Sequence, residues 1–397
     1  MSRVYLNQLG IVCALGVGKR EVASRLFQSD QPGGLILDAA LLPERQLMLG
    51  RVTTGVPNLA HLPTSMQGRN NALLQLALEQ IRGQVDAAVE KYGRNRVGVI
   101  LGTSTSGVAE SEAAHKQRKR SESDAWPPQF HYAQQEMGTP AAFVAAELGI
   151  SGPSYVISTA CSSSAKALAA AARLLRSGQL DAVIAGGADS LCGFTVAGFA
   201  ALGAVSYERC NPCSVNRKGI NIGEGAALFL VTREPAEVAL LGWGESADAH
   251  HMSAPDPTGN GPAAAITAAL ERAQLRPDQI DYINLHGTAT VQNDRMETAA
   301  VARLFGDQTP ASSTKPLTGH TLGAAGAIEA ALCWLSLCEN PQSLLPPHWW
   351  DGEHDPELSA LALVAPGSVS ARPLRLLLSQ SFAFGGSNAA LVLGAQQ

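Results

Sequence analysis

One cysteine, Cys161, lies in the stretch of the chain best suited to covalent chemistry. It belongs to Ser158–Ser164, which follows the apolar run Tyr155–Ile157 and precedes the Ala- and Leu-rich segment Ala165–Leu175. This order predicts a buried strand, a sharp turn and a buried helix. The unpaired N–H groups and the dipole at the start of a helix favour a thiolate over a thiol and could hold an oxyanion. Cys161 is therefore a candidate nucleophile, although cysteine is also often buried for packing alone.

Two of the nine histidines lie in settings suited to proton transfer. His286 belongs to Asn284–Thr290, at the end of the predicted strand Ile280–Leu285, and strand ends are where active sites of α/β proteins collect. His320 belongs to Lys315–Gly326, a glycine-rich turn that enters a helix. A lone histidine is usually structural. Two histidines flanked by Gly and Thr, with a candidate nucleophile upstream, predict a catalytic site.

A further motif, Ser381–Asn388, carries two phenylalanines and a Gly-Gly pair. The glycines permit a strained turn that presents a backbone N–H. Phe382 and Phe384 are placed to gate an apolar channel, and the alternative for both is plain core packing.

The composition excludes several classes of protein. Of 397 residues, 46% are hydrophobic and 16% charged, which predicts a large buried core. The net charge of -5 and the lack of a basic patch argue against nucleic-acid binding. The densest basic run, Lys116–Arg120, is expected to be a solvated helix face or loop, within a polar and mobile segment from 115 to 130.

The cysteines point to a reducing compartment. All seven have irregular spacings, which is not a disulfide framework. The lone CxxC at Cys210–Cys213 has no second ligand pair, so no metal site is expected. The chain shows neither a signal peptide nor an apolar stretch long enough to span a bilayer, and we expect a cytoplasmic protein.

Strands alternate with helices along both halves, which predicts an α/β fold with sheets covered on both faces. A boundary near 233–240 divides the chain into residues 1–235, with the cysteine, and residues 236–397, with both histidines. The predicted helices are Val22–Phe27, Asn71–Val85, Thr139–Leu148, Ala165–Leu175, Gly261–Ala273, Asp294–Leu304 and Gly323–Leu337. The predicted strands include Val97–Leu101, Asp181–Ala188, Ala226–Thr232, Ala236–Gly242, Ile280–Leu285, Leu374–Gln380 and Ala389–Leu393.

Taken together, the motifs resemble those of a β-ketoacyl-ACP synthase, an elongating condensing enzyme of the thiolase superfamily. The Cys, HGTxT and GHTxGAAG motifs occur in the family's order, and His251–Pro255 and Gly223–Ala226 are similar to two further family motifs. The resemblance covers almost the whole chain. It implies a thiolase-like five-layer α-β-α-β-α fold of two similar halves, normally in a dimer.

The resemblance also implies a reaction. Cys161 would take an acyl group from the phosphopantetheine arm of acyl carrier protein, with the backbone N–H groups of Cys161 and Phe384 as oxyanion hole. Malonyl-ACP would then lose CO2, and neutral His286 and His320 would donate hydrogen bonds to its thioester oxygen. The resulting carbanion would attack the acyl-cysteine to give β-ketoacyl-ACP.

Other positions match family residues. Lys315 and Glu329 match a buried pair that orients the histidines. Residues that resemble contacts of the pantetheine arm or gates of the acyl pocket are Thr288, Thr290, Ser253, Phe382 and Phe199. The implied partners are acyl carrier protein and a second synthase subunit, identical or paralogous. No metal and no cofactor beyond the carrier's arm is implied.

The chain departs from the family around Cys210–Ile220, where the usual sequence is close to C-R-P-F-D-x-x-R-D-G-F. The replacements are Asn211, Cys213, Ser214, Lys218 and Ile220, while Gln380 replaces a usual Asn and Lys166 is uncommon in the nucleophile helix. We interpret these changes as marks of a specialised synthase, for a polyene or another secondary-metabolite chain.

Four other functions are compatible with parts of the sequence. A chain-length-factor-like subunit typically lacks the nucleophile that this chain keeps. The initiating synthases carry Asn where this chain has His320, and a thiolase would carry a second cysteine within Ser379–Asn388, which has none. A cysteine hydrolase is not excluded outright, but it would leave the GHTxGAAG segment unexplained.

Overall fold

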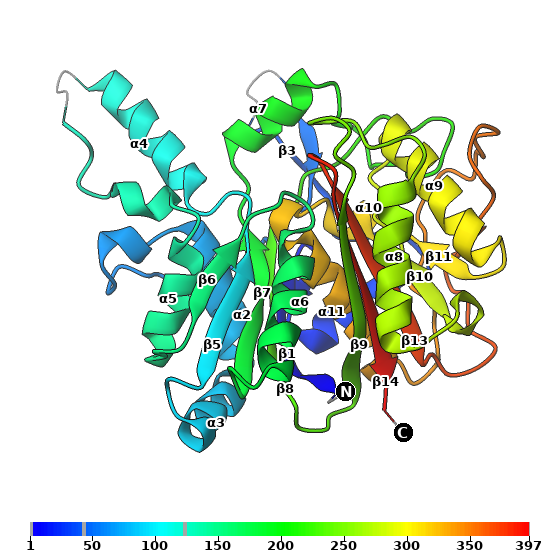
Figure 1. The fold of residues 1–397 in the computed structure, drawn as a ribbon. Helices are drawn as coiled ribbons and strands as arrows, with labels where there is room; N and C mark the ends of the chain where they lie inside the picture. The colour runs from blue at the N-terminus through cyan, green and yellow to red at the C-terminus, as the bar shows by residue number, and fades with distance from the viewer. Residues whose placement is uncertain (1–2, 42–44, 122–124, 397) are drawn as a thin grey trace.

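A mixed sheet in two halves forms the core of the computed structural model, which describes residues 3–41, 45–121 and 125–396 (Figure 1). The strand order is β12-β11-β10-β13-β14-β9-β1-β8-β7-β5-β6, with β2 beside β1. At the seam, β1 (Val4–Cys13) meets β9 (Val238–Ala247) through the pairs Val4–Leu240 and Tyr5–Ala239. Only these two residue pairs join β1 to β9, so the sheet divides here into two halves. Each half is covered by its own helices.

The first half of the sheet has the order β1-β8-β7-β5-β6 and is covered on its outer face by three helices. Val-, Ile- and Leu-rich strands bury both faces here, as strands between two helical layers must. Its further strands are β2 (Gly16–Val17), β5 (Val97–Gly102), β6 (Ser154–Ile157), β7 (Ala182–Asp189) and β8 (Gly225–Thr232). The outer helices are α2 (Arg69–Glu79), α3 (Arg82–Tyr92) and α5 (Thr139–Leu148).

The second half continues from β9 and is covered on its outer face by α8 (Asn260–Ala273) and α9 (Val291–Phe305). Ile266 and Met296 of these helices pack with Ile283 and Val392 of the strands. The further strands are β10 (Tyr282–Asn284), β11 (Pro310–Ser312), β12 (Ala362–Leu363), β13 (Leu376–Ala383) and β14 (Ser387–Ala395).

Two alanine-rich helices, α6 (Ser163–Arg176) and α11 (Ala325–Cys338), form the middle layer between the two halves of the sheet (Figure 1). A Cβ placed on Gly326 of α11 would lie 2.7 Å from Cβ of Ala165 in α6, so the helices touch almost backbone to backbone. The predicted five-layer α-β-α-β-α, thiolase-like fold is confirmed. The division at residues 235 and 236 stays a prediction.

The remaining elements lie around these layers. They are α1 (Lys19–Leu26), β3 (Ile36–Asp38), β4 (Leu47–Leu49), η1 (Thr64–Met66), α4 (Val108–Arg120), η2 (Tyr132–Gln135), α7 (Gly193–Ala201), η3 (Pro277–Gln279), α10 (Lys315–Thr318) and η4 (Leu322–Ala324). Of the helices within the described ranges, none has the length and apolar character needed to cross a bilayer.

Two predictions of local structure are wrong. The single helix Asn71–Val85 is two helices, because the backbone leaves the helical region at Ile81 (φ −121°). The strand before the nucleophile is not buried: among the described strands β6 pairs only with β5, and Tyr155 is 39% exposed. Residues 115–120 of the segment expected to be mobile form the end of helix α4, and 122–124 lie outside the described residues. The mobility itself stays a prediction.

We predict that Gly326→Val destabilises the protein by about 1–3 kcal/mol, because the added methyl groups force α11 away from α6. Gly83→Ala, on the exposed side of α3 with no atom near the added methyl, is the matched control and should stabilise by up to about 1 kcal/mol. Chemical denaturation of both variants measures these changes. Equal stability of the two variants would contradict the contact.

Candidate active site

The nucleophile candidate Cys161 lies on the turn between β6 and α6, as the sequence predicted. Ala160 has a positive φ of 52°, an uncommon value for a residue with a side chain, and this turns the chain sharply into the helix. The Ser163 hydroxyl stabilises the turn by donating to the Ala160 carbonyl (2.6 Å) and accepting from the Thr159 N–H (2.8 Å). Cys161 is consequently held at the start of α6 and is only 5% exposed.

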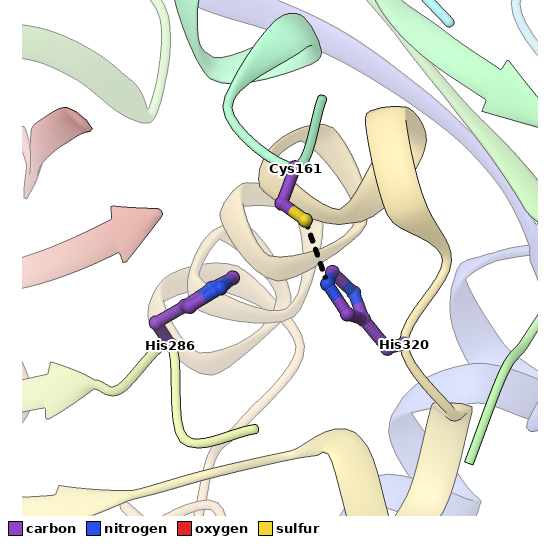
Figure 2. Close-up of side chains that lie close together, drawn as sticks. All are labelled: Cys161, His286 and His320. Carbon is purple, nitrogen blue, oxygen red and sulfur yellow. Dashed lines mark hydrogen bonds between the residues drawn. The ribbon is translucent and has the colours of Figure 1, made fainter. Parts of the chain in front are cut away.

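His320 contacts the cysteine directly. Its Nε2 lies 2.9 Å from Cys161 Sγ, and Figure 2 shows both side chains converging with His286. The backbone N–H of His320 donates to the Asn221 carbonyl (2.6 Å), which fixes the glycine-rich turn that carries it. Burial, with Lys315 as second cause, holds the pKa of His320 well below its usual value. His320 is therefore a neutral imidazole.

His286 follows β10 and is held by a carboxylate beneath it. Glu297 of α9 accepts from the backbone N–H of His286 (2.6 Å) and from that of Gly287 (2.7 Å). The Lys315 ammonium lies 3.5 Å from Nδ1 of His286, and an ammonium can only donate. The imidazole proton of His286 is therefore on Nε2. Burial, followed by Lys315 and His320, holds the pKa of His286 well below its usual value.

Lys315 and Glu329 form a buried ion pair behind the histidines. Both are about as buried as core residues, at 1% and 2% exposed, and Lys315 Nζ donates to Glu329 Oε1. Neither side chain lines the cavity described below. A buried cation without such a partner would be costly, so the carboxylate keeps a positive charge next to the imidazoles.

The predicted preference of Cys161 for the thiolate is wrong for this structure. Burial raises the pKa of Cys161 to about 12 and outweighs Lys315 and the backbone N–H groups of Phe384 and of Cys161 itself, which act in the opposite direction. The group facing His320 is thus a thiol, which donates to the neutral imidazole. Attack by sulfur requires transfer of its proton.

The same two backbone N–H groups lie close enough to the sulfur to act as hydrogen-bond donors, as the predicted oxyanion hole requires. Phe384 precedes two glycines with positive φ, Gly385 at 83° and Gly386 at 72°. A Cβ on Gly386 would lie 2.7 Å from Cβ of Asp248. The predicted Gly-Gly turn is confirmed, with positive φ values that glycine adopts without strain, and it presents the N–H of Phe384 toward Cys161.

A cavity of about 550 Å³ opens onto Cys161 and both histidines. The phenyl rings of Phe199 and Phe384 meet across it with centroids 5.6 Å apart, and the Thr288 and Thr290 hydroxyls lie 2.9 Å apart. All the residues predicted to contact substrate line it: Thr288, Thr290, Ser253, Phe382 and Phe199. The structure thus gathers the predicted set from both halves of the chain.

The family departures in the Cys210–Ile220 stretch and at Gln380 lie in three places. Lys218 and Ile220 line the cavity. Gln380 lies deeper and donates to Glu297 (2.7 Å), the carboxylate that holds the His286 loop. Asn211 and Ser214 instead contact Asp351, and the Cys213 N–H donates to Asp294.

Lys166 and Glu297 add contacts that the sequence did not reveal. Lys166 donates to the Ser387 hydroxyl (2.6 Å), which joins the nucleophile helix to the end of the glycine turn. Glu297 was missed because a lone acid in a helix carries no spacing signal. Its burial raises its pKa to about 7, against hydrogen bonds that include those from Gly287 and Gln380.

The sequence predicted no metal site at Cys210–Cys213. Within the ranges that the structure describes, one group has the spacing of metal ligands, and it consists of Cys161, His286 and His320. The 2.9 Å between sulfur and nitrogen is a hydrogen-bond length. It is shorter than the about 3.5 Å that separates S and N ligands around tetrahedral zinc. This arrangement fits a thiol–imidazole pair.

The fold and this Cys-His-His site define a condensing enzyme of the thiolase type, and comparison with known proteins identifies the family. Residues 66–236 match the family described as Beta-ketoacyl synthase, N-terminal domain, and residues 238–348 match Beta-ketoacyl synthase, C-terminal domain. The chain belongs to the β-ketoacyl synthase family. The predicted class of enzyme, an acyltransferase that condenses acyl units in fatty-acid or polyketide elongation, is confirmed.

Three individual relatives support the assignment to this family. The chain is 30% identical to Nodulation protein E of Rhizobium meliloti over 98% of both chains. It is 31% identical to 3-oxoacyl-[acyl-carrier-protein] synthase 2 of Staphylococcus aureus over 84% of this chain and 86% of the other. A chain from the complex of a ketosynthase with its chain length factor from Xenorhabdus doucetiae is 42% identical, with a TM-score of 0.91 over 100% of this chain and 98% of that one.

We predict that removing the buried ion pair together, in Lys315→Met/Glu329→Gln, moves the acid limb of the condensation rate to higher pH. Lys315 lowers the pKa of both histidines, so without it their pKa values rise and protonation begins at higher pH. A pH–rate profile against the parent measures the shift. An acid limb that stays in place, or moves down, would show that Lys315 does not control the imidazoles.

Proposed function

We propose that the protein is a β-ketoacyl-ACP synthase in which Cys161 is acylated from acyl-ACP. As sulfur attacks the thioester carbonyl, His320 Nε2 takes the thiol proton and passes it to the departing pantetheine thiolate. The backbone N–H groups of Cys161 and Phe384 hold the oxyanion. The observation that carries this proposal is the 2.9 Å contact between Cys161 and a neutral His320.

In the second step malonyl-ACP enters and loses CO2, and the C–C bonding electrons form an enolate. His286, with its proton on Nε2, donates to the thioester oxygen as charge develops there. His320 donates beside it after its ring exchanges protons with water, so that the proton on Nδ1 is replaced by one on Nε2. The enolate carbon attacks the acyl-Cys161 carbonyl, and the tetrahedral intermediate expels the cysteine. Cys161 recovers a proton through His320, and β-ketoacyl-ACP leaves.

The other site residues support these steps without reacting. Lys315 and Glu329 position His286 and keep both imidazoles neutral. Thr288, Thr290 and Ser253 hydrogen-bond the pantetheine arm, while Phe382 and Phe199 gate the acyl chain. No metal or further cofactor takes part.

We further propose a heterodimer with a paralogous, chain-length-factor-like subunit, in a polyene or other secondary-metabolite pathway. The 42% identity to a chain from a ketosynthase–chain length factor complex supports this partner. The half-exposed edge strand β6, with Tyr155 at 39%, supports a paired surface next to the nucleophile. A role as the non-catalytic subunit itself is disfavoured because the chain keeps Cys161 and both histidines. A cytoplasmic location remains part of this proposal.

We predict that incubation with a panel of acyl-ACPs adds the acyl mass to the parent protein and none to Cys161→Ala. Cys338→Ala is the control, since Cys338 is a half-buried cysteine outside the cavity, and this variant should acylate like the parent. Intact mass spectrometry measures the adducts. An adduct that persists in Cys161→Ala would refute the nucleophile.

The pathway is tested by condensation with malonyl-ACP, with and without a co-expressed paralogous subunit. We predict that the partner is needed for full turnover and that acyl chains carrying conjugated double bonds are extended faster than saturated ones. Mass analysis of the ACP-bound products reports both. Extension of saturated chains alone, by a homodimer, would place the enzyme in ordinary fatty-acid elongation.

A further inference from the structure

A third histidine, His348, lies outside every motif of the family site and forms hydrogen bonds through both ring nitrogens. It follows α11, is 1% exposed, and its Nδ1 accepts from the backbone N–H of Ser313 (3.0 Å). Its Nε2 lies 2.9 Å from the backbone carbonyl of Pro212. A backbone N–H only donates and a carbonyl only accepts, so the ring is neutral with its proton on Nε2.

The hydrogen bond from the Ser313 N–H to His348, which we call the Ser313 arm, connects His348 to the catalytic histidine His286. The Ser313 hydroxyl donates to the carbonyl of Gly287 (2.7 Å), the residue directly after His286. The backbone N–H of Lys315 donates to the same hydroxyl (3.3 Å). One serine thus joins the His286 loop to the start of α10, whose Lys315 ammonium faces His286 Nδ1 at 3.5 Å.

The hydrogen bond from His348 to the Pro212 carbonyl, which we call the Pro212 arm, connects His348 to the wall of the cavity. The next residue, Cys213, donates its N–H to Asp294 at the start of α9 (2.9 Å). Further along the same loop, the Gly219 N–H donates to the Ala289 carbonyl in the His286 loop (2.9 Å). Residues 217–220 line the cavity. His348 is therefore a second crosslink, which joins this wall to the segment beneath His286.

We propose that His348 is a positioning residue for the condensation step, because its Ser313 arm sets the placement of His286 relative to Lys315 and its Pro212 arm sets the cavity wall. This inference rests on the proposed function and extends it to a residue that no motif marks. The acylation step depends on Cys161, His320 and Phe384, which His348 does not contact. A loss of His348 should therefore separate the two half-reactions. Burial lowers the pKa of His348 to about 4, so this neutral crosslink persists at neutral pH.

Two substitutions separate the arms. In His348→Gln the amide nitrogen lies near the place of Nε2 and keeps the donor to Pro212, but the acceptor for Ser313 is lost. In His348→Asn the amide oxygen lies near the place of Nδ1 and keeps that acceptor, but the side chain is too short for Pro212. The two variants have the same charge and nearly the same chemistry, so each is the control for the other.

We expect His348→Gln to slow malonyl-ACP decarboxylation and condensation about tenfold or more, while the rate of Cys161 acylation stays within about twofold of the parent. His348→Asn should keep condensation within about threefold and change the KM for the acyl chain instead. Ser313→Ala, which removes the hydroxyl bridge and leaves His348 intact, should reproduce the pattern of His348→Gln. It keeps the inference testable where His348→Gln fails to fold.

Single-turnover acylation by mass spectrometry and release of CO2 from malonyl-ACP, both on variants with parent-like circular dichroism, give the two rates. Parallel loss of both half-reactions, in His348→Gln or in Ser313→Ala, would overturn the positioning role. So would equal loss of condensation in His348→Gln and His348→Asn. Failure of the parent itself to acylate would refute the proposed function and this inference together, whereas a normal parent with uniformly slowed variants refutes only the inference.

Discussion

The Lys315–Glu329 ion pair is the interaction on which the site depends. It places the Lys315 ammonium in the protein interior next to two imidazoles, and this charge is tolerated because a carboxylate lies against it. Its field acts in the same direction as burial, against protonation of His286 and His320. Both rings are thereby kept as neutral donors, which can stabilise an enolate without binding the malonyl carboxylate as permanent cations would.

The geometry of the fold explains why this pair can be buried so completely. Lys315 begins α10 and Glu329 lies in α11, in the layer between the two halves of the sheet. The close approach of α6 and α11 at Gly326 brings Cys161 of the first half next to the histidines of the second. The active site is thus a product of the contact between halves, and neither half holds the complete set of reacting groups.

Local sequence was enough to predict the reacting groups but not what holds them. Cys161 and His286 each lie where a strand is followed by a helix, and His320 lies on the glycine-rich turn between α10 and η4. The small residues that mark these turns are local signals. Glu297 and His348 have no such marks, because their roles arise from partners far away in the chain, such as Ser313 and Pro212 for His348. The exposure of β6 was missed for a related reason, since an apolar run does not tell a central strand from an edge strand.

The thiol of Cys161 shows how a sound local argument can be outweighed. The start of α6 and the nearby N–H groups do favour a thiolate. Burial disfavours the charged form more strongly than these groups favour it, so the pKa of Cys161 rises. The sulfur therefore needs a base in contact, and His320 lies in contact with it. A protonated resting thiol also protects the enzyme from oxidation and from reaction with stray electrophiles, because only the thiolate is a strong nucleophile. Reactivity then develops only when a thioester occupies the oxyanion hole and makes the transfer of the proton to His320 productive.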